Sequence, residues 1–478
     1  MSAARRLSDL VQRDMADDPM IRGVTADSRK VEAGWLFAAL PGASVDGKSF
    51  IPAALERGAA AVIAGDEVGG LGAPLVKVHD PRRAYALAAA AFYGRRPETC
   101  VAITGTNGKT SVATFCRQIF EACGRAAASM GTLGVTAGSD QLTPPGLTTP
   151  DAADVARLLA DLADRGVTHL ALEASSHGID QRRLDGVTLK AAGFLNLTQD
   201  HLDYHGTMGA YRAAKLRLFD TLLPRGATAV LNADSEAFPA FAAAAVAGGM
   251  SLMTVGAMGE GLTLAGRVAR PGGQRLKVIA WGRPYEIDLP LAGAFQAANA
   301  LVAAGLCIAA GEKVAPVLAA LETLAGAPGR LQHAATGPRG GEAFVDYAHT
   351  PDGLSAVLGA LRPHAPGRLI VVFGAGGDRD RAKRPLMAAA VGALADIAIV
   401  TDDNPRSEDP AAIRAEVLAG ASRLLEIGDR RAAIRHAASL LGAGDILVVA
   451  GKGHEQGQTV GAVTHPFDDL AETKAALR

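Results

Sequence analysis

The clearest chemical signal in the sequence is the segment VAITGTNGKTSVATFCRQIF at residues 101–120. It begins with the largely apolar run VAIT, as in a buried strand, which leads into a glycine-containing turn that ends at Lys109. The N–H groups of such a turn, and those at the start of the helix that follows, bind phosphate oxygens. Lys109 would neutralise the β- and γ-phosphates of a nucleotide, and the Thr110 hydroxyl would bind Mg²⁺. The pattern therefore predicts a nucleotide-binding loop.

The spacing of this loop departs from the usual phosphate-binding motif. Two residues, rather than four, separate Gly105 from Gly108 and Lys109. So short a motif is weak evidence by itself, and an ordinary strand-to-helix turn is the alternative. The apolar strand before it and the amphipathic helix after it favour the nucleotide loop. The predicted nucleotide contacts are Gly105, Thr106, Asn107, Gly108, Lys109, Thr110 and Ser111.

Carboxylate and imidazole side chains follow two further predicted strands. The segment HLALEASSHG carries Glu173 at the end of its apolar run, and GFLNLTQDHLDYHG carries His201 and His205. Close to a nucleotide loop, such groups suit a second divalent cation. The i,i+4 spacing of the two histidines leaves a zinc site as an alternative, and simple surface histidines as another. Zinc is disfavoured because Leu202, and not the Glu of an HExxH motif, follows His201.

The last part of the chain supplies the elements that would position a second set of polar residues. Short β-branched runs alternate with helix-like stretches there, which implies βαβ units and a parallel sheet. Each run leads into a polar or glycine-rich loop: YAHTPD, GAGGDRD, DDNPR or GKGHE. Ligands bind beyond the carboxyl ends of such strands, so we expect the four loops to share one edge. The predicted strands are 343–347, 368–373, 396–401 and 446–450, and the predicted helices include 382–394 and 410–424.

Length and composition indicate an α/β protein of several domains. A chain of 478 residues suits about three domains of roughly 150 residues each. With 49% hydrophobic and 20% charged residues, the composition is globular and excludes wholesale disorder or a fibrous structure. The formal net charge of -1 disfavours a general nucleic-acid binder. We place the domains at 1–97, 98–328 and 329–478.

The cysteine content and the hydropathy pattern favour the cytoplasm. There are 4 cysteines and no CxxC pair, which fits a reducing compartment. The first residues contain no apolar run of the kind a signal peptide has. Two uncharged windows, 237–259 and 289–311, are long enough to span a bilayer, but each contains proline with glycine or polar residues. We interpret them as buried helices followed by turns, and expect no membrane span.

Seven motifs in order resemble those of the Mur ligases of peptidoglycan synthesis. They are ITGTNGKTS, EASSHGI, NLTQDHLDYHG, DYAHTPDGL, GGDRDRAKRP, TDDNPRSEDP and GKGHE, and TADSRKV at 25–31 also fits. The resemblance covers all three predicted domains. It implies an N-terminal domain that binds the UDP end of the substrate, a central ATPase domain of the P-loop type, and a Rossmann-like C-terminal domain that binds the incoming amino acid.

The resemblance also implies a reaction on small molecules, in a protein expected to be monomeric. ATP would phosphorylate the γ-carboxylate of the D-Glu in a UDP-muramoyl dipeptide, and the amine of the amino acid would attack the acyl phosphate. An amide, ADP and phosphate would result, with no nucleophilic side chain required. A folate polyglutamylating ligase of the same superfamily is disfavoured by the DNPR and GKGHE pair and by the extra N-terminal domain. A nucleotide switch or motor ATPase that forms no bond is the alternative from another class.

Individual roles follow from the same resemblance. Glu173 and His201 match ligands of the second Mg²⁺, and Lys215 matches a lysine that carries a carbamate able to bind this metal ion. With Lys109, these residues form the predicted catalytic group. Gln296 stands where close relatives often have Asn, so we leave it out of the site. The dipeptide positions are Ser28, Thr148, Thr149, Ser175, Gln181 and Arg183, and the adenosine-side positions are Asn299, Arg330, Asp346 and His349.

The sequence DNPR indicates which amino acid is added. Diaminopimelate has a second carboxylate at its far end, and a guanidinium can bind a carboxylate through two hydrogen bonds. Arg406 is the candidate, and the resemblance is to the diaminopimelate-adding members of the family. A lysine-adding ligase is the nearest alternative, but such relatives usually lack this arginine, because lysine has no distal acid. The predicted contacts of the amino acid are Arg379, Asp403, Asn404, Pro405, Arg406, Gly451 and Glu455.

Overall fold

The computed structural model describes residues 3–42, 45–270 and 272–478. It divides into two compact units, which are described separately. The first unit contains residues 1–254 and 305–313, and the second contains residues 255–304 and 314–478. Helix α10 (Ala294–Ala309) contributes residues to both.

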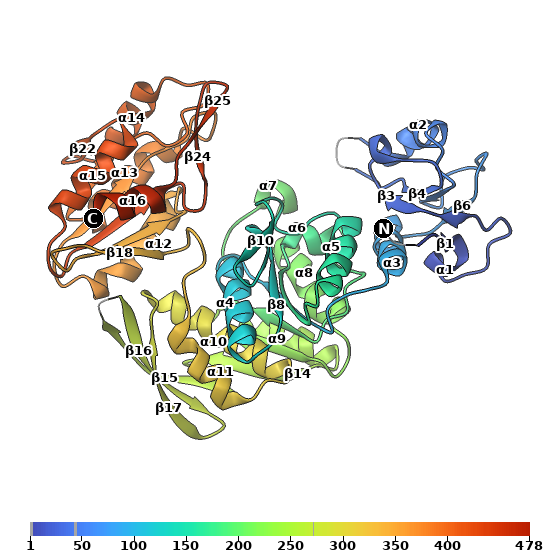
Figure 1. Ribbon diagram of the computed structural model, residues 1–478, viewed down its shortest axis with the longest axis horizontal. Coiled ribbons are helices and arrows are strands. Elements are labelled where there is room, and N and C mark those ends of the chain that lie inside the picture. Colours follow the sequence, from blue (N-terminus) through green and yellow to red (C-terminus); the bar gives the residue numbers. More distant parts are fainter. Residues whose placement is uncertain (1–2, 43–44, 271) are drawn as a thin grey trace. The chain divides into compact units, whose positions relative to one another are not determined.

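The first unit begins with a four-stranded parallel sheet in the order β3-β4-β5-β6. Helix α2 lies on one face of this sheet, and α1 and α3 lie on the other (Figure 1). Both faces of the strands are therefore apolar, as is usual where helices cover both sides of parallel strands. The elements are β1 (Arg5–Arg6), α1 (Leu7–Val11), β2 (Met20–Ile21), β3 (Gly23–Thr25), β4 (Trp35–Ala38), α2 (Ile51–Glu56), β5 (Ala61–Ala64), β6 (Leu75–Lys77) and α3 (Pro81–Tyr93).

The same unit continues into the first eight strands of an 11-stranded sheet, in the order β10-β9-β8-β11-β7-β12-β13-β14. Strands β8, β11, β7, β12 and β13 are parallel, and β9 and β10 pair antiparallel at one end. Because β7, β11 and β12 are parallel neighbours, the residues after their carboxyl ends meet at one edge of the sheet. The strands are β7 (Thr99–Thr104), β8 (Ala127–Gly131), β9 (Gly134–Ala137), β10 (Asp140–Thr143), β11 (His169–Glu173), β12 (Ala191–Phe194), β13 (Thr228–Asn232) and β14 (Ser251–Gly256).

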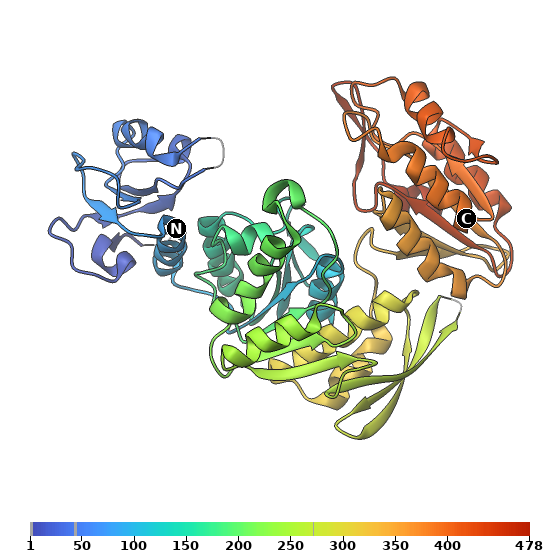
Figure 2. The same ribbon diagram turned by 180° about the vertical axis from the view of Figure 1, so that it is seen from behind.

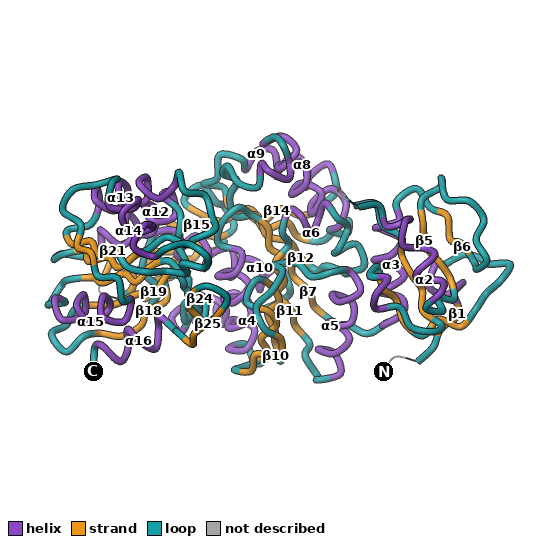
Figure 3. Tube along the Cα trace, turned by 90° about the horizontal axis from the view of Figure 1, so that it is seen from above, coloured by secondary structure: helices purple, strands orange, loops and turns teal. Residues whose placement is uncertain are grey.

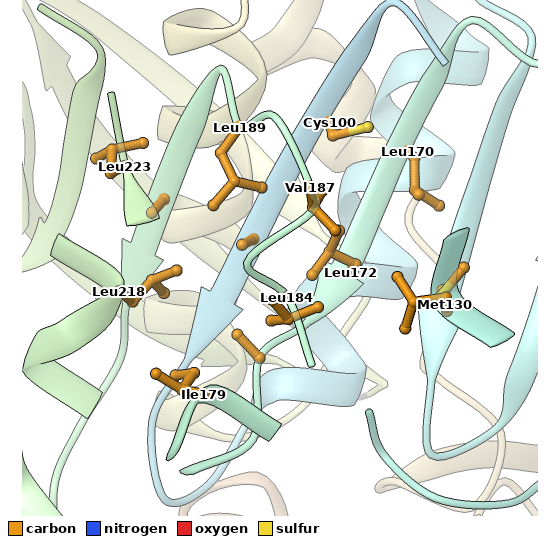
Figure 4. Packing of buried hydrophobic residues seen from close by; sticks show 14 of the residues in the cluster. Cys100, Met130, Leu170, Leu172, Ile179, Leu184, Val187, Leu189, Leu218 and Leu223 are labelled. Carbon is orange, nitrogen blue, oxygen red and sulfur yellow. The ribbon is translucent and has the colours of Figure 1, made fainter. Parts of the chain in front are cut away.

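Helices cover this sheet through apolar faces. Helix α4 buries Val112, Phe115, Cys116, Ile119 and Phe120, which recur at the spacing of one helical face. Figure 4 shows part of the apolar cluster on one face of the sheet, with side chains from β7, β8 and β11 and from the chain beyond α6. The helices are α4 (Lys109–Ala122), α5 (Ala152–Asp164), α6 (Ser176–Asp180), α7 (Leu202–His205), α8 (Met208–Arg217) and α9 (Phe238–Ala247).

The second unit begins with three antiparallel strands, which form a twisted ribbon (Figure 2). These strands are β15 (Leu262–Arg270), β16 (Gly273–Ala280) and β17 (Arg283–Leu289). Helix α10 and helix α11 (Val314–Ala320) follow them along the chain.

The C-terminal part of the second unit is a six-stranded sheet in the order β18-β19-β23-β20-β21-β22. All neighbouring strands are parallel except β18 and β19. Helices α12, α13 and α14 lie on one face, and α15 and α16 on the other (Figure 3). Successive residues of each strand point to opposite faces, so Val371 and Phe373 contact the first group of helices while Ile370 and Val372 contact the second.

The strands of this sheet, the helices on its two faces and the hairpin β24–β25 have the following bounds. They are β18 (Gln332–Thr336), β19 (Glu342–Asp346), α12 (Pro351–Leu361), β20 (Leu369–Phe373), α13 (Lys383–Leu394), β21 (Ile397–Val400), α14 (Pro410–Leu418), β22 (Leu425–Glu426), α15 (Arg430–Leu440), β23 (Ile446–Ala450), β24 (Gly457–Val460), β25 (Val463–Pro466) and α16 (Asp469–Ala476).

The α/β class with parallel-rich sheets is confirmed, and so are the four predicted C-terminal strands, each within a residue or two. The predicted helix 410–424 is wrong at its end, because α14 stops at Leu418. Gly420, two residues later, lies so close to α13 that a Cβ on it would be 1.9 Å from the carbonyl oxygen of Pro385. Among the described residues, no helix is both long and apolar enough to cross a membrane, and the two uncharged windows contain α9 and α10.

Candidate active site

The predicted nucleotide loop connects the buried strand β7 to the first turn of α4. Gly108 has φ +92°, in the left-handed region that favours glycine. Asn196, beyond the end of β12, holds the loop: its side chain accepts from the Asn107 N–H at 2.9 Å and donates to the Asn107 carbonyl at 3.1 Å. The Thr106 N–H donates to the Asn196 carbonyl at 3.0 Å. The loop is thus fixed from the neighbouring parallel strand.

Two lysines converge on this loop. The Lys109 ammonium donates to the carbonyls of Gly105 and Thr106, each at 2.9 Å. Lys215, from α8, donates to the same Gly105 carbonyl at 2.9 Å and lies 4.5 Å from the ring centre of Tyr211. Lys215 is only 1% exposed, and burial, with a contribution from Lys109, lowers its pKa to about 6. Its neutral amine is therefore favoured at neutral pH.

Glu173, the last residue of β11, lies beside the start of α4 and is 3% exposed. Its carboxylate accepts from the Thr110 hydroxyl at 3.1 Å and from the Thr132 N–H at 2.9 Å. Gly131 makes room for it, because a Cβ there would lie 2.0 Å from Oε1 of Glu173. The hydroxyl predicted to bind Mg²⁺ and the predicted carboxylate ligand are therefore brought together.

His201 lies among the aromatic rings next to this region. It has φ +52° just before α7, and its ring centre is 4.9 Å from that of His177 and 6.1 Å from that of Tyr211. Tyr211 also contacts Lys215, so one aromatic ring links the two predicted ligands. Within the described ranges, no group of three or more His, Cys, Asp or Glu side chains is arranged to hold a metal ion.

The predicted dipeptide residues of the central sheet form one hydrogen-bonded group next to Glu173. The Thr149 hydroxyl donates to the Glu173 carbonyl at 3.0 Å and accepts from the N–H and hydroxyl of Ser175. Arg183 donates to the Thr149 carbonyl at 2.6 Å and to the Gln181 side chain at 2.7 Å. Thr148 joins the group through the Thr132 hydroxyl at 2.9 Å. Ser28 lies apart from this group along the chain, at the start of the 3₁₀ helix Ser28–Lys30.

The predicted adenosine-side residues of the second unit are also connected. Asn299 donates to the Gln296 side chain at 3.2 Å, and Gln296 donates to the Arg330 carbonyl at 3.4 Å. Gln296, which is not among the predicted site residues, thus links two of them. Arg330 lies over the Tyr347 ring at 4.6 Å. His349 contacts the Tyr347 carbonyl through Nδ1 at 2.8 Å.

Asp346, at the end of β19, fixes the chain around these residues. Its carboxylate accepts from the N–H groups of Leu331 and Ala348, at 2.6 and 2.7 Å. Burial raises the pKa of this carboxyl group. Asp346 therefore fixes the backbone next to Arg330 by accepting these two hydrogen bonds.

The predicted amino-acid residues gather at the carboxyl ends of β21 and β23. Asn404 donates to Glu455 at 2.9 Å and accepts from the buried Lys452 ammonium at 2.7 Å. Oδ2 of Asp403 is buried and has no hydrogen-bond partner in the described part of the chain. Gly451, at φ +121°, lies close to this oxygen, and a Cβ at Gly451 would be only 2.5 Å from it.

Arg406 and Arg379 reach this region from neighbouring loops. Arg406 donates to the Gly377 carbonyl at 2.7 Å, and Arg379, which is exposed, donates to the Asp378 carbonyl at 3.2 Å. Pro405 is buried between Asn404 and Arg406. The four polar loops predicted to share one edge therefore do so, since each follows a strand of the same parallel set.

Several polar residues of these networks were missing from the predicted set. Lys452 lies within the GKGHE motif and could have been chosen as a charged residue between glycines. Thr132 and Tyr211 carry no local signal, because their roles depend on contacts with Glu173 and Lys215 from distant parts of the chain.

Three family models match the chain in succession. They are the Mur ligase family catalytic domain at residues 20–93, the Mur ligase middle domain at 103–307 and the Mur ligase glutamate ligase domain at 329–453. The matched segments include the nucleotide loop, Glu173, Lys215 and the C-terminal strands described above.

Several individual proteins are similar to this chain over nearly its whole length. UDP-N-acetylmuramoyl-L-alanyl-D-glutamate–2,6-diaminopimelate ligase of Caulobacter vibrioides is 69% identical, with 99% of each chain covered. The protein of the same name from Mesorhizobium japonicum is 54% identical over 98% of this chain and 97% of its own. A solved structure of a ligase of that name has a TM-score of 0.77 and 34% identity, covering 100% of this chain and 99% of the other. The chain belongs to the Mur ligase family.

Proposed function

We propose that this protein is an ATP-dependent, ADP-forming ligase that adds meso-diaminopimelate to the D-Glu of UDP-MurNAc-L-Ala-D-Glu. The relatives that are similar over the whole chain carry the corresponding name. The observation that best supports this activity is the arrangement of Lys109 and Lys215 on the Gly105 carbonyl, beside the Glu173–Thr110 pair. Phosphoryl transfer between two anions needs a cation such as Lys109, and oxygen ligands for a metal ion, around a fixed phosphate loop.

In the proposed reaction, the γ-carboxylate of D-Glu attacks the γ-phosphorus of ATP, and ADP leaves. The N–H groups at the start of α4 and the Lys109 ammonium would stabilise the phosphate oxygens during this step. The amine of the amino acid then attacks the acyl carbon and displaces phosphate, which forms the amide. The residues of this chain bind and orient three small molecules, and none needs to form a covalent bond with the substrate.

The residues around the loop fit Mg²⁺ as a cofactor. Thr110 and Glu173 offer the oxygen donors that this ion prefers, and their side chains are already in contact. Bound there, Mg²⁺ would offset the negative charge of the phosphates. His201 would complete the second metal site, together with a carbamate on Lys215.

The environment of Lys215 supports carbamate formation. Its amine is buried and lies near the Lys109 cation, and both lower its pKa. A neutral amine can attack the carbon of CO₂, forming an N–C bond and releasing a proton. The product is an anion with two oxygen donors, which an unmodified lysine cannot supply.

The C-terminal loops provide complementary charges for diaminopimelate. Arg406 would bind the distal carboxylate, while Asp403 and Glu455 would bind ammonium groups. Oδ2 of Asp403, which is buried and has no partner among the residues that the structure describes, supports the assignment, because an oxygen of this kind is costly unless a ligand satisfies it. We further propose that the enzyme acts as a monomer in the cytoplasm.

The deciding experiment measures phosphate release from ATP and Mg²⁺ with UDP-MurNAc-L-Ala-D-Glu, adding meso-diaminopimelate or L-lysine in parallel. We expect release only when the dipeptide and diaminopimelate are both present. Release with lysine instead would leave a ligase with a different amino-acid specificity. Release that is indifferent to both additions would contradict the ligase and indicate an ATPase that forms no bond.

Replacing the residue assigned to the distal carboxylate tests the specificity separately. Arg406→Ala should lower kcat/KM for diaminopimelate by about a hundredfold, because a carboxylate would then be buried without its cation. Use of lysine should remain poor, and the KM for ATP should be unchanged. Wild-type kinetics with diaminopimelate in the Arg406→Ala variant would remove this residue from the pocket.

A further inference from the structure

Arg384, a second arginine near Arg406, is completely buried and is not one of the predicted site residues. The Arg384 side chain, in the first turn of α13, is 0% exposed. Its two terminal nitrogens donate to the two oxygens of Glu408, at 2.9 and 2.8 Å. One of them also donates to Glu416 at 2.8 Å, and the other to the Gly376 carbonyl at 3.2 Å. Removing a guanidinium from water is costly, so bonds of this number and geometry are needed to hold it there.

Glu408 connects this buried charge to the loop that carries Arg406. Besides Arg384, it accepts from the Asp378 N–H at 2.6 Å. Asp378 in turn accepts from the N–H and hydroxyl of Ser407, at 3.2 and 2.5 Å. Residues 376–378 and 406–408 are therefore tied together by reciprocal bonds directly after Arg406.

The two segments also approach each other through glycine. The Gly377 N–H donates to the Asn404 carbonyl at 2.9 Å, and a Cβ on Gly377 would lie 1.9 Å from the Pro405 carbonyl oxygen. A Cβ on Gly376 would lie 2.9 Å from a terminal nitrogen of Arg406. No larger residue fits at Gly377 without moving the loops apart, and a side chain at Gly376 would displace the Arg406 guanidinium, so its position depends on both glycines.

The backbone of Arg406 is strained and needs support from both sides. Its φ of +51° lies in the left-handed region, which costs energy for a residue with a side chain and persists only where neighbours hold it. On one side, its N–H donates to Thr459 at 3.0 Å and its carbonyl accepts from Gly461 at 2.7 Å. On the other side, the support comes from Glu408 and, through it, from Arg384.

From these contacts, we infer that the Arg384–Glu408 ion pair positions the amino-acid pocket and sets its selectivity. The pair fixes the 406–408 segment against the 376–378 segment, so that the Arg406 guanidinium is held where a distal carboxylate must lie. Arg384 acts through Glu408 and is a positioning residue. The inference rests on the proposed function, because only an amino acid with a second carboxylate gains from a fixed Arg406.

Glu416 offers a matched comparison within the same cluster. Like Glu408, it is a partly exposed glutamate bonded to Arg384. It belongs to α14, however, and its other partner is Arg381 rather than a group of the 376–378 segment. The same substitution at the two glutamates therefore separates the effect on the loop from the general effect of weakening a bond to a buried arginine.

The experiment compares Glu408→Gln with Glu416→Gln in the full chain, by phosphate release at varied diaminopimelate. Glu408→Gln should raise the KM for diaminopimelate by about tenfold or more, because small displacements of a binding group have large effects. The KM values for ATP and the UDP-dipeptide should stay unchanged, and the preference for diaminopimelate over lysine should fall. Glu416→Gln should keep the wild-type KM for diaminopimelate.

One further variant, at the other member of the ion pair, separates the possible failures. Arg384→Met should reproduce the selective rise in KM; if it does not fold, Glu408→Gln still decides, since glutamine keeps the shape of a partly exposed side chain. Equal KM values for diaminopimelate in the two glutamate variants, or a joint rise for all three substrates with a lower melting temperature, would overturn the positioning role alone. A wild-type enzyme that uses lysine and not diaminopimelate would overturn the proposed function, and this inference with it.

Discussion

Lys109→Met should reduce phosphate release, measured with all three substrates present, on the order of 10³-fold. Methionine fills a similar volume but carries no charge, so the loop would keep its packing and lose its cation. In the structure, the Lys109 ammonium is bonded to the carbonyls of Gly105 and Thr106, at the turn that would hold the nucleotide. Binding ATP would bring phosphate oxygens to a position where this charge is already fixed.

A matched control for this variant is Lys190→Met. Lys190 is exposed and precedes β12, at the edge of the central sheet opposite to the nucleotide loop. It should retain wild-type activity, and both variants should melt near the wild-type temperature. If Lys109→Met kept more than about a tenth of the activity, the loop would not be the phosphate site, since such a cation is worth far more in phosphoryl transfer.

The parts of the fold that could be predicted are those with local causes. The C-terminal strands are short β-branched runs, and their observed bounds follow the sequence pattern closely. The nucleotide loop could be predicted because strand, glycine turn and helix are consecutive. The end of α14 was predicted too late, although Gly420 is a local stop signal; the tight approach of Gly420 to Pro385 of α13 could not be predicted locally.

The same distinction holds for the candidate site. Glu173 and Asp403 follow apolar strands, so their position at the carboxyl edge could be inferred from the sequence. Their partners could not: Thr132 reaches Glu173 only because β8 pairs with β11. The Arg384–Glu408 pair joins a helix to a loop 24 residues later, and nothing in the local sequence indicates which of the nearby charges will be buried.

The other large effect concerns Lys215. If this residue carries a carbamate that binds Mg²⁺, Lys215→Met should lower activity on the order of 10³-fold, as expected when a group that organises the phosphoryl transfer is lost. Lysine is an unusual choice for a site that is 1% exposed and next to another cation. As an ammonium, it would add positive charge where Lys109 already supplies it; as a carbamate, it would supply oxygen ligands instead.

A direct measurement distinguishes these two roles. Wild-type protein incubated with ¹³C-labelled bicarbonate should show a carbamate signal by NMR, and Lys215→Met should show none at this position. Arg212→Ala is the control, because Arg212 is an exposed residue of the same helix and should keep both the signal and the activity. An active wild-type enzyme without any carbamate signal would mean that Lys215 acts as an amine, held by the Gly105 carbonyl and Tyr211. Full activity of Lys215→Met would remove it from the reaction altogether, and the metal ligands would then have to be sought among Glu173, His201 and the substrates themselves.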